Sequence, residues 1–222
     1  TVLATLGVDR TYRTRWFSEW NQFSLARYED GHPATRRLHI AWFAPTHERV
    51  HDFWQAGVDA GYESDGEPGP RPEYGPDYYG GFLLDPDGNS AEAVHNDQGR
   101  RAGSLDHLWI RVADVPAAKR FYETIAPHAG IRLNDDTPER AQFLVEGGSF
   151  SLVGGEPTEN VHLAFGTEDD ADVDAFHAAA TGAGHRSLGV PGERPRYHPG
   201  YYAAYVADPD GNNIEVVNHN RR

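Results

Sequence analysis

The sequence predicts an α+β protein that contains two tandem copies of one module, and three observations predict it. Residues 38–94 align without a gap on residues 161–217, so one segment occurs twice. Both copies carry Asp-Pro-Asp-Gly-Asn between two apolar runs, which is typical of a hairpin with a type I turn. Runs that alternate apolar and polar residues flank runs with the period of an amphipathic helix.

The repeat also gives the expected domain boundaries. We expect a first module over residues 1–98, a polar linker that contains glycine over 99–104, and a complete second module over 105–222. At the same offset, residue 1 falls on residue 124, inside the first helix of the second copy. We therefore expect that the opening strand and most of the first helix of module one are missing, and that they precede Thr1.

The second copy opens with strand and helix signals. The alternation in Leu105–Val112 predicts a strand with His107, Trp109 and Arg111 on one face. A helix should begin at Pro116 and end at Gly130. Two strands should follow, around 141–145 and 149–153.

The second half of this copy repeats the order strand, helix, hairpin. We expect a strand over Val161–Phe165, then a helix capped by Asp169 and stopped near Gly182. After a proline-rich loop, Tyr201–Ala207 and Asn213–Val217 should pair as a hairpin. The module is thus a doubled strand, helix and strands unit.

Composition narrows the function classes. Apolar residues make up 38% of the chain and charged residues 24%, which is enough apolar matter for a core. The formal net charge of −14 with no basic stripe argues against binding to nucleic acid or to a membrane surface. No apolar run is long enough to span a bilayer. The lack of cysteine removes thiolate ligands and is compatible with a cytoplasmic protein.

Three residues interrupt strands with a metal-ligating side chain. Glu215 lies between Ile214 and Val216, and His162 and His107 are placed similarly in their strands. A carboxylate at mid-strand is costly unless it is paired, ligated or hydrated, and a strand histidine can equally be a solvent-facing residue. Two histidines and one carboxylate are the ligands of a facial triad for a divalent ion such as Fe, Zn, Mn or Ni.

These segments resemble the vicinal oxygen chelate superfamily, which includes glyoxalase I, bleomycin-resistance proteins and extradiol dioxygenases. The residues that carry the resemblance are Leu-Asp-His107-Leu-Trp, Val-His162-Leu-Ala-Phe and Tyr-Val-Ala-Asp-Pro-Asp-Gly-Asn-Asn-Ile-Glu215. The resemblance implies paired βαβββ units that form cupped mixed β-sheets with flanking helices. It also implies a metal held by His107, His162 and Glu215.

The resemblance leaves the activity open. Glyoxalase I has a fourth ligand on the fourth strand, and residues 149–153 offer no such side chain. A three-ligand site is similar to that of the extradiol dioxygenases. We expect a metal-dependent lyase, isomerase or dioxygenase acting on a small substrate through two neighbouring oxygens. The alternative is a protein without catalysis that sequesters a drug or another small molecule, as bleomycin-resistance proteins do.

Secondary candidates complete the predictions. His198 is a candidate general acid or base, because it lies in a loop that could fold over the site and histidine titrates near neutral pH. His39 and Glu92 repeat the spacing of His162 and Glu215, and are candidates for a second metal site if a histidine from before Thr1 joins them. A homodimer is the expected form of self-association.

Overall fold

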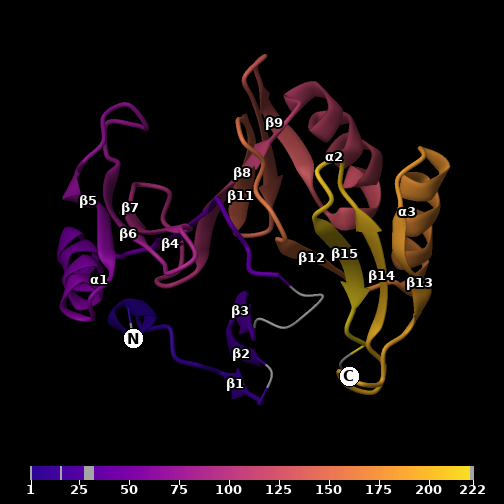
Figure 1. Ribbon diagram of the computed structural model, residues 1–222, viewed down its shortest axis with the longest axis horizontal. Coiled ribbons are helices and arrows are strands. Elements are labelled where there is room, and N and C mark those ends of the chain that lie inside the picture. Colours follow the sequence, from indigo (N-terminus) through magenta and orange to yellow (C-terminus); the bar gives the residue numbers. More distant parts are fainter. Residues whose placement is uncertain (1, 16, 28–32, 221–222) are drawn as a thin grey trace. The chain divides into compact units, whose positions relative to one another are not determined.

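The computed structural model describes residues 2–15, 17–27 and 33–220, and the chain divides into two compact units at residues 109 and 110 (Figure 1). Both units combine helices with mixed β-sheets. The predicted α+β class with two modules is confirmed.

The first unit opens with a small layer of its own. A 3-10 helix, η1 (Val2–Leu6), precedes a three-stranded antiparallel sheet in the order β1-β2-β3. Its strands are β1 (Tyr12–Arg13), β2 (Phe17–Trp20) and β3 (Phe23–Ala26). The aligned second copy has strands β9 (Arg132–Asp136), β10 (Arg140–Val145) and β11 (Gly148–Gly154) in this place.

The rest of the first unit is a mixed sheet covered by one helix. Within this unit the strand order is β5-β6-β7-β4-β8, with β4 and β7 parallel. The elements are β4 (Leu38–Phe43), α1 (His47–Asp59), β5 (Glu63–Pro70), β6 (Tyr79–Leu84), β7 (Ser90–His95) and the start of β8 (Leu105–Val112). Helix α1 packs on the sheet through the buried side chains of Val50 and Phe53.

The second unit repeats this plan twice. Its strands follow the orders β8-β11-β10-β9 and β12-β15-β14-β13, and helices α2 and α3 lie against each other (Figure 1). The remaining elements are α2 (Val115–Ala129), β12 (His162–Thr167), α3 (Asp170–Gly182), β13 (Ser187–Glu193), β14 (Tyr202–Ala207) and β15 (Asn213–Asn218).

The helix ends of the second unit follow from local chemistry. The Asp114 carboxylate accepts a hydrogen bond from the backbone N–H of Ala117, and Asp169 does the same for Ala171. Gly130 ends α2 at a φ of 62°, where glycine carries no steric penalty. The predicted positions of both helices and of the hairpin β14–β15 are confirmed to within one or two residues.

Strands β5, β9 and β13 lie where the sequence predicted no strand. β5 and β13 form the edges of their sheets, and both contain proline and glycine. Their pairing with β6 and β14 shifts register twice in each copy. Proline and glycine are tolerated at such edges and bulges. Because both residue types are also typical of loops, the sequence did not predict β5 and β13 as strands.

Strand β8 bears on the predicted module boundaries. The predictions of 1–98, 99–104 and 105–222 assign all of β8 to the second module. In the structure β8 begins in the first compact unit and ends in the second, because the chain divides between Trp109 and Ile110.

A helix that crosses a bilayer must be both long and apolar. No helix in the described part of the chain satisfies both requirements for crossing a membrane.

Candidate metal centre

Two neighbouring parallel strands bring His39 and Glu92 together. His39 of β4 is in register with Ser90 of β7, and Glu92 lies two residues further along β7, hence on the same face of the sheet. The Nε2 atom of His39 lies 3.0 Å from Oε2 of Glu92. Strand pairing alone therefore positions the first two potential ligands.

His107 of β8 supplies a third ligand atom at the same place. Its Nε2 atom lies 3.5 Å from Oε2 of Glu92, and its ring stacks on that of His39 with centroids 5.3 Å apart. One ligand atom from each of the three residues falls within 4.8 Å of the others. Among the described residues, this is the one set of three or more such side chains that converges.

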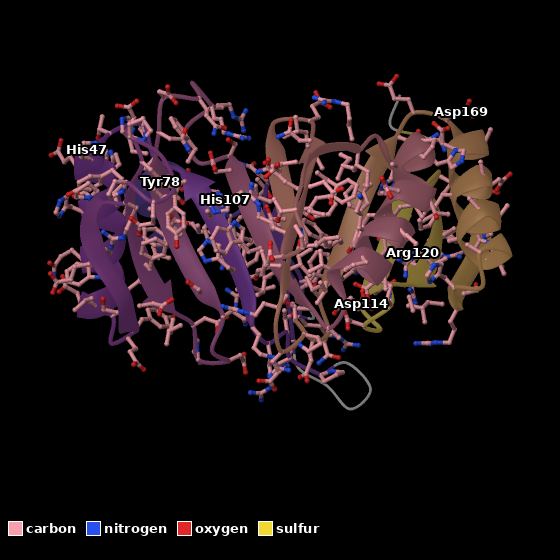
Figure 2. The ribbon with its side chains drawn as sticks, turned by 90° about the horizontal axis from the view of Figure 1, so that it is seen from above. His47, Tyr78, His107, Asp114, Arg120 and Asp169 are labelled. Atoms are coloured by element: carbon pink, nitrogen blue, oxygen red, sulfur yellow. The ribbon has the colours of Figure 1, made fainter. Side chains whose placement is uncertain are left out.

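The Glu92 carboxylate is fully buried, and both of its oxygens are used. Oε2 faces the two histidines, while Oε1 accepts a hydrogen bond of 2.7 Å from the Tyr78 hydroxyl. Burial, the nearby charge of Glu92 and this hydrogen bond raise the pKa of Tyr78 far above its ordinary value. The phenol therefore stays protonated and acts as a donor (Figure 2 labels Tyr78 and His107).

Gly80 leaves the space that the Glu92 carboxylate occupies. A Cβ atom at this position would lie 2.5 Å from Oε1 of Glu92, closer than any side chain tolerates. Gly80 and Glu92 are on the same face of the adjacent strands β6 and β7. The absent side chain thus forms a recess for the carboxylate.

Asp106 orients the imidazole of His107 from the other side. Its Oδ1 atom lies 2.8 Å from Nδ1 of His107, and its Oδ2 atom lies 2.9 Å from the Arg100 guanidinium. Burial would raise the pKa of Asp106, but its contacts with His107, Arg100 and Asn96 outweigh burial and lower it. An ionised Asp106 accepts a hydrogen bond from the Nδ1–H of His107, which leaves the lone pair of Nε2 available on the side that faces Glu92.

Aromatic side chains surround the three ligands. The Trp109 ring lies 5.5 Å from that of His39 and 6.2 Å from that of His107, centroid to centroid. Phe82 lies 6.1 Å from His39, and Tyr74 packs edge-on against Trp109 at 5.5 Å. The side chains of His39 and His107 are only 13% and 11% exposed in these surroundings.

The second copy reproduces two of the three ligands. Nε2 of His162 lies 2.7 Å from Oε2 of Glu215, and the Tyr201 hydroxyl donates to Oε1 at 2.7 Å. Glu215 is buried, whereas the His162 side chain is 48% exposed. Buried Glu215 is thus paired, as a carboxylate at mid-strand requires.

The structure therefore sorts the predicted ligands into two groups. His107 lies with His39 and Glu92 in the first unit, and His162 lies with Glu215 in the second. The sequence predicted that His39 and Glu92 would need a histidine from before Thr1, and the structure places His107 beside them. The predicted triad of His107, His162 and Glu215 spans the two units and stays a prediction.

His198 lies in the second unit, in the loop before β14. Its Nδ1 atom is 2.9 Å from the carbonyl oxygen of Pro199, and its Nε2 atom is 3.1 Å from Nδ1 of His219. Its ring also packs against Tyr201. Its predicted role as an acid or base stays a prediction.

The donor set of the first unit fits a divalent ion. Two neutral imidazole nitrogens and one carboxylate oxygen suit Zn, Fe, Mn or Ni, and the chain has no cysteine to compete. Asp106, Tyr78 and Gly80 fix the ligands, and the sequence prediction missed all three. Two signals were present: Asp106 directly precedes His107, and Tyr78 falls on Tyr201 in the repeat.

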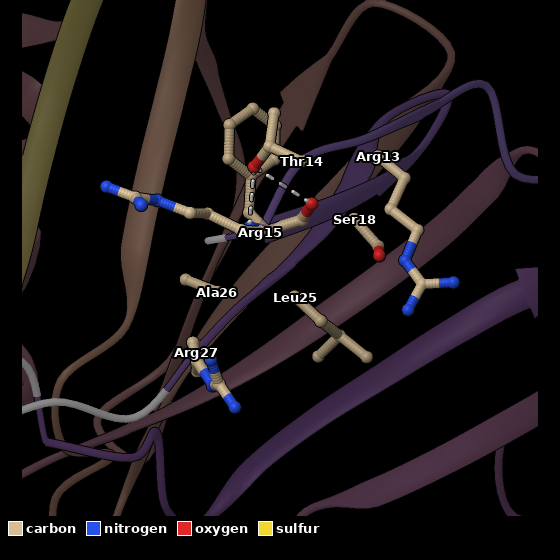
Figure 3. A pocket seen from close by; sticks show the side chains of 8 residues that line it. Arg13, Thr14, Arg15, Ser18, Leu25, Ala26 and Arg27 are labelled. Carbon is tan, nitrogen blue, oxygen red and sulfur yellow. Dashed lines mark hydrogen bonds between the residues drawn. The ribbon is translucent and has the colours of Figure 1, made fainter.

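A separate hollow lies along the small sheet of β1–β3 (Figure 3). Arg13, Arg15 and Arg27 are among its lining residues, but their side chains point away from one another. None of its lining residues belongs to the group of His39, Glu92 and His107, and its arginine side chains do not converge on one point.

Comparisons with known proteins agree with the fold. The model of the family described as "Glyoxalase/Bleomycin resistance protein/Dioxygenase superfamily" matches residues 104–216. A V278E mutant of glyoxalase I from Zea mays has a TM-score of 0.67 at 20% identity over 97% of this chain and 85% of that one. Glyoxalase I from the same plant has a TM-score of 0.62 at 18% identity over 96% and 83%. At these identities the likeness shows the fold alone.

A shorter structure matches part of the chain. It is a glyoxalase/bleomycin resistance protein from Albidiferax ferrireducens T118, with 28% identity over 51% of this chain and 96% of that one, and a TM-score of 0.45. None of the curated proteins matches the sequence.

Proposed function

Since the chain belongs to the glyoxalase, bleomycin resistance protein and dioxygenase superfamily, we propose that it is a divalent-metal enzyme whose ion is held by His39, Glu92 and His107. Its substrate is a small molecule that approaches the ion through two neighbouring oxygens. The observation that carries the proposal is the convergence of these three side chains on one point.

The chain's own residues have distinct tasks in this proposal. His39 and His107 present Nε2 atoms and Glu92 presents Oε2, which leaves further coordination positions open for substrate oxygens. Asp106 keeps His107 in the tautomer that can bind. The rings of Trp109 and Phe82 offer apolar surface to the carbon part of the substrate. When bound, the ion acts as a Lewis acid that stabilises negative charge on substrate oxygens.

The metal decides between the reaction classes. An iron-loaded site that turns over catechols with oxygen uptake would assign the chain to extradiol-type dioxygenases. A zinc, nickel or manganese site without oxygen uptake would favour a lyase or isomerase. His198 is a further proposal as acid or base, tested by the pH profile of turnover in His198→Ala once a substrate is known.

Elemental mass spectrometry of the purified chain tests the metal site. We expect close to one equivalent of metal in the wild type and in His162→Ala, and almost none in His39→Ala. His39 and His162 are the equivalent residues of the two copies, so the two variants are matched.

The opposite pattern, with metal lost only in His162→Ala, would favour the triad of His107, His162 and Glu215. No metal in the wild type, even after reconstitution, would contradict the enzyme proposal. It would then favour the alternative, a protein that only binds a drug or another small molecule.

A further inference from the structure

The two oxygens of Glu92 have different surroundings. Oε2 lies 3.0 Å from Nε2 of His39 and 3.5 Å from Nε2 of His107. Oε1 points the other way, towards the Tyr78 hydroxyl at 2.7 Å. A carboxylate with free rotation could offer an ion both oxygens, so the Tyr78 contact selects between two modes of ligation.

Tyr78 is itself held in place. Its carbonyl oxygen accepts a hydrogen bond from the backbone N–H of Arg71, and its own N–H donates to the carbonyl of Gly75. Its ring contacts Tyr74 at 5.1 Å between centroids. These contacts hold both the backbone and the ring that carry the hydroxyl.

Gly80 restricts Glu92 from a second direction. Oε1 fills the place next to Gly80 where a Cβ atom would be only 2.5 Å away. The recess and the hydroxyl together fix the position of Oε1, and the rigid geometry of the carboxylate then fixes Oε2.

The second copy repeats the tyrosine contact but not the recess. The Tyr201 hydroxyl lies 2.7 Å from Oε1 of Glu215, at the same spacing along the chain. Ala203 stands where Gly80 stands in the first copy. The two copies therefore offer a matched pair of tyrosines, one of which serves a carboxylate that has two histidine neighbours.

We propose that Tyr78 is a positioning residue that holds Oε1 of Glu92, so that this carboxylate binds the ion through Oε2 alone and a coordination position stays open for substrate. The inference rests on the proposed function, because it assumes that Glu92 is a ligand. Nothing in it requires Tyr78 to touch the substrate.

Cobalt binding to the full chain tests this role without any substrate. The visible absorption of bound Co²⁺ reports the number and kind of its ligands, and competition with a chromophoric chelator gives the affinity. In Tyr78→Phe we expect the affinity to fall by about 10- to 100-fold, the usual cost of losing a partner of a ligand. We also expect its absorption band to change, because Oε1 loses its hydrogen-bond donor and the carboxylate can change its mode of ligation.

Tyr201→Phe is the matched control, in which affinity and spectrum should both equal those of the wild type. Gly80→Ala is a second variant, which we expect to weaken cobalt binding by displacing Oε1. If Tyr78→Phe does not fold, Gly80→Ala tests whether a fixed Oε1 matters for cobalt binding, and unchanged affinity would contradict the proposal. Circular dichroism establishes folding for each variant.

The outcomes separate the two proposals. If the wild type and Tyr78→Phe bind cobalt with equal affinity and identical spectra, the role of Tyr78 is wrong while the metal site stands. An equal loss in Tyr201→Phe would also contradict it. A wild-type chain that takes up no cobalt overturns the proposed function and this inference with it.

Discussion

At the scale of single residues, the candidate site is built around a buried carboxylate, and burying a carboxylate costs free energy. Glu92 and Glu215 are both buried at mid-strand, and each has a histidine at one oxygen and a tyrosine at the other. A buried charge without such partners would cost several kcal/mol. The partners explain how the fold tolerates these residues, and the third side chain, His107, completes the proposed metal site.

Asp106→Asn should weaken metal binding without unfolding the chain. An amide cannot fix the His107 tautomer as a carboxylate does, so we expect the affinity for Zn²⁺ to fall by about 10- to 100-fold. Competition with a chromophoric chelator measures this. Asp97→Asn, at an exposed acid nearby, serves as the control. Equal affinities in Asp106→Asn and the wild type would show that Asp106 does not orient His107.

His185 should make the protein less stable in mild acid. Partial burial against Phe121 lowers the pKa of His185 below its ordinary value of 6.5, so the folded state disfavours its charged form. As the pH falls below 6.5, His185 is protonated in the unfolded chain before it is protonated in the folded chain. The free energy of unfolding therefore decreases until the pH lies below the folded-state pKa.

Urea unfolding at about pH 8 and about pH 5 tests this linkage. His185→Gln should lose less stability between the two pH values than the wild type. A loss as large as that of the wild type would contradict the role of His185.

The sequence predicted which residue types form the site but not which of them meet. His39, Glu92, His162 and Glu215 are recognisable because each breaks an apolar strand pattern. The spacing is the same in both copies, so it could not decide which pair His107 joins. Strand order decides it, since β8 is the neighbour of β4 in the sheet.

At the scale of elements, the repeat governs strand pairing. β4 pairs with β7 and β12 with β15, both in parallel and with the histidine two residues out of register with its glutamate. The helix signals were sufficient to predict α2 and α3, and the turn signal was sufficient to predict the hairpin β14–β15. β5 and β13 were missed because bulged edge strands need neither alternation nor β-branched residues.

Helix α2 carries an unfavourable buried group that can be removed. Tyr122 is fully buried among Phe121, Phe143 and Phe150, and its hydroxyl has no hydrogen-bond partner among the described residues. Tyr122→Phe should raise the free energy of unfolding by about 1 kcal/mol, because a buried unpaired hydroxyl is costly. Chemical denaturation measures this, and a loss of stability would show that the hydroxyl is satisfied.

At the scale of the whole molecule, the proposed metal site would link ion binding to folding. An ion that binds only the folded chain stabilises it by about 2.7 kcal/mol at a concentration 100 times its dissociation constant. We therefore expect Zn²⁺ to raise Tm in the wild type and in His162→Ala but not in His39→Ala. Calorimetry measures Tm, and an equal rise in all three proteins would indicate binding elsewhere.

Binding of the same ion should slow backbone hydrogen exchange more in one unit than in the other. All three proposed ligands belong to the unit that ends at Trp109, so hydrogen exchange should slow in β4, β7 and the start of β8. Protection confined to β12 and β15 would contradict this assignment.

The most direct test of the central claim is a crystal structure of the zinc-loaded chain with anomalous scattering at the zinc edge. We predict one peak bonded to Nε2 of His39, Oε2 of Glu92 and Nε2 of His107, at about 2.0 to 2.2 Å from each atom. A peak beside His162 and Glu215, with none at His39, would contradict the account.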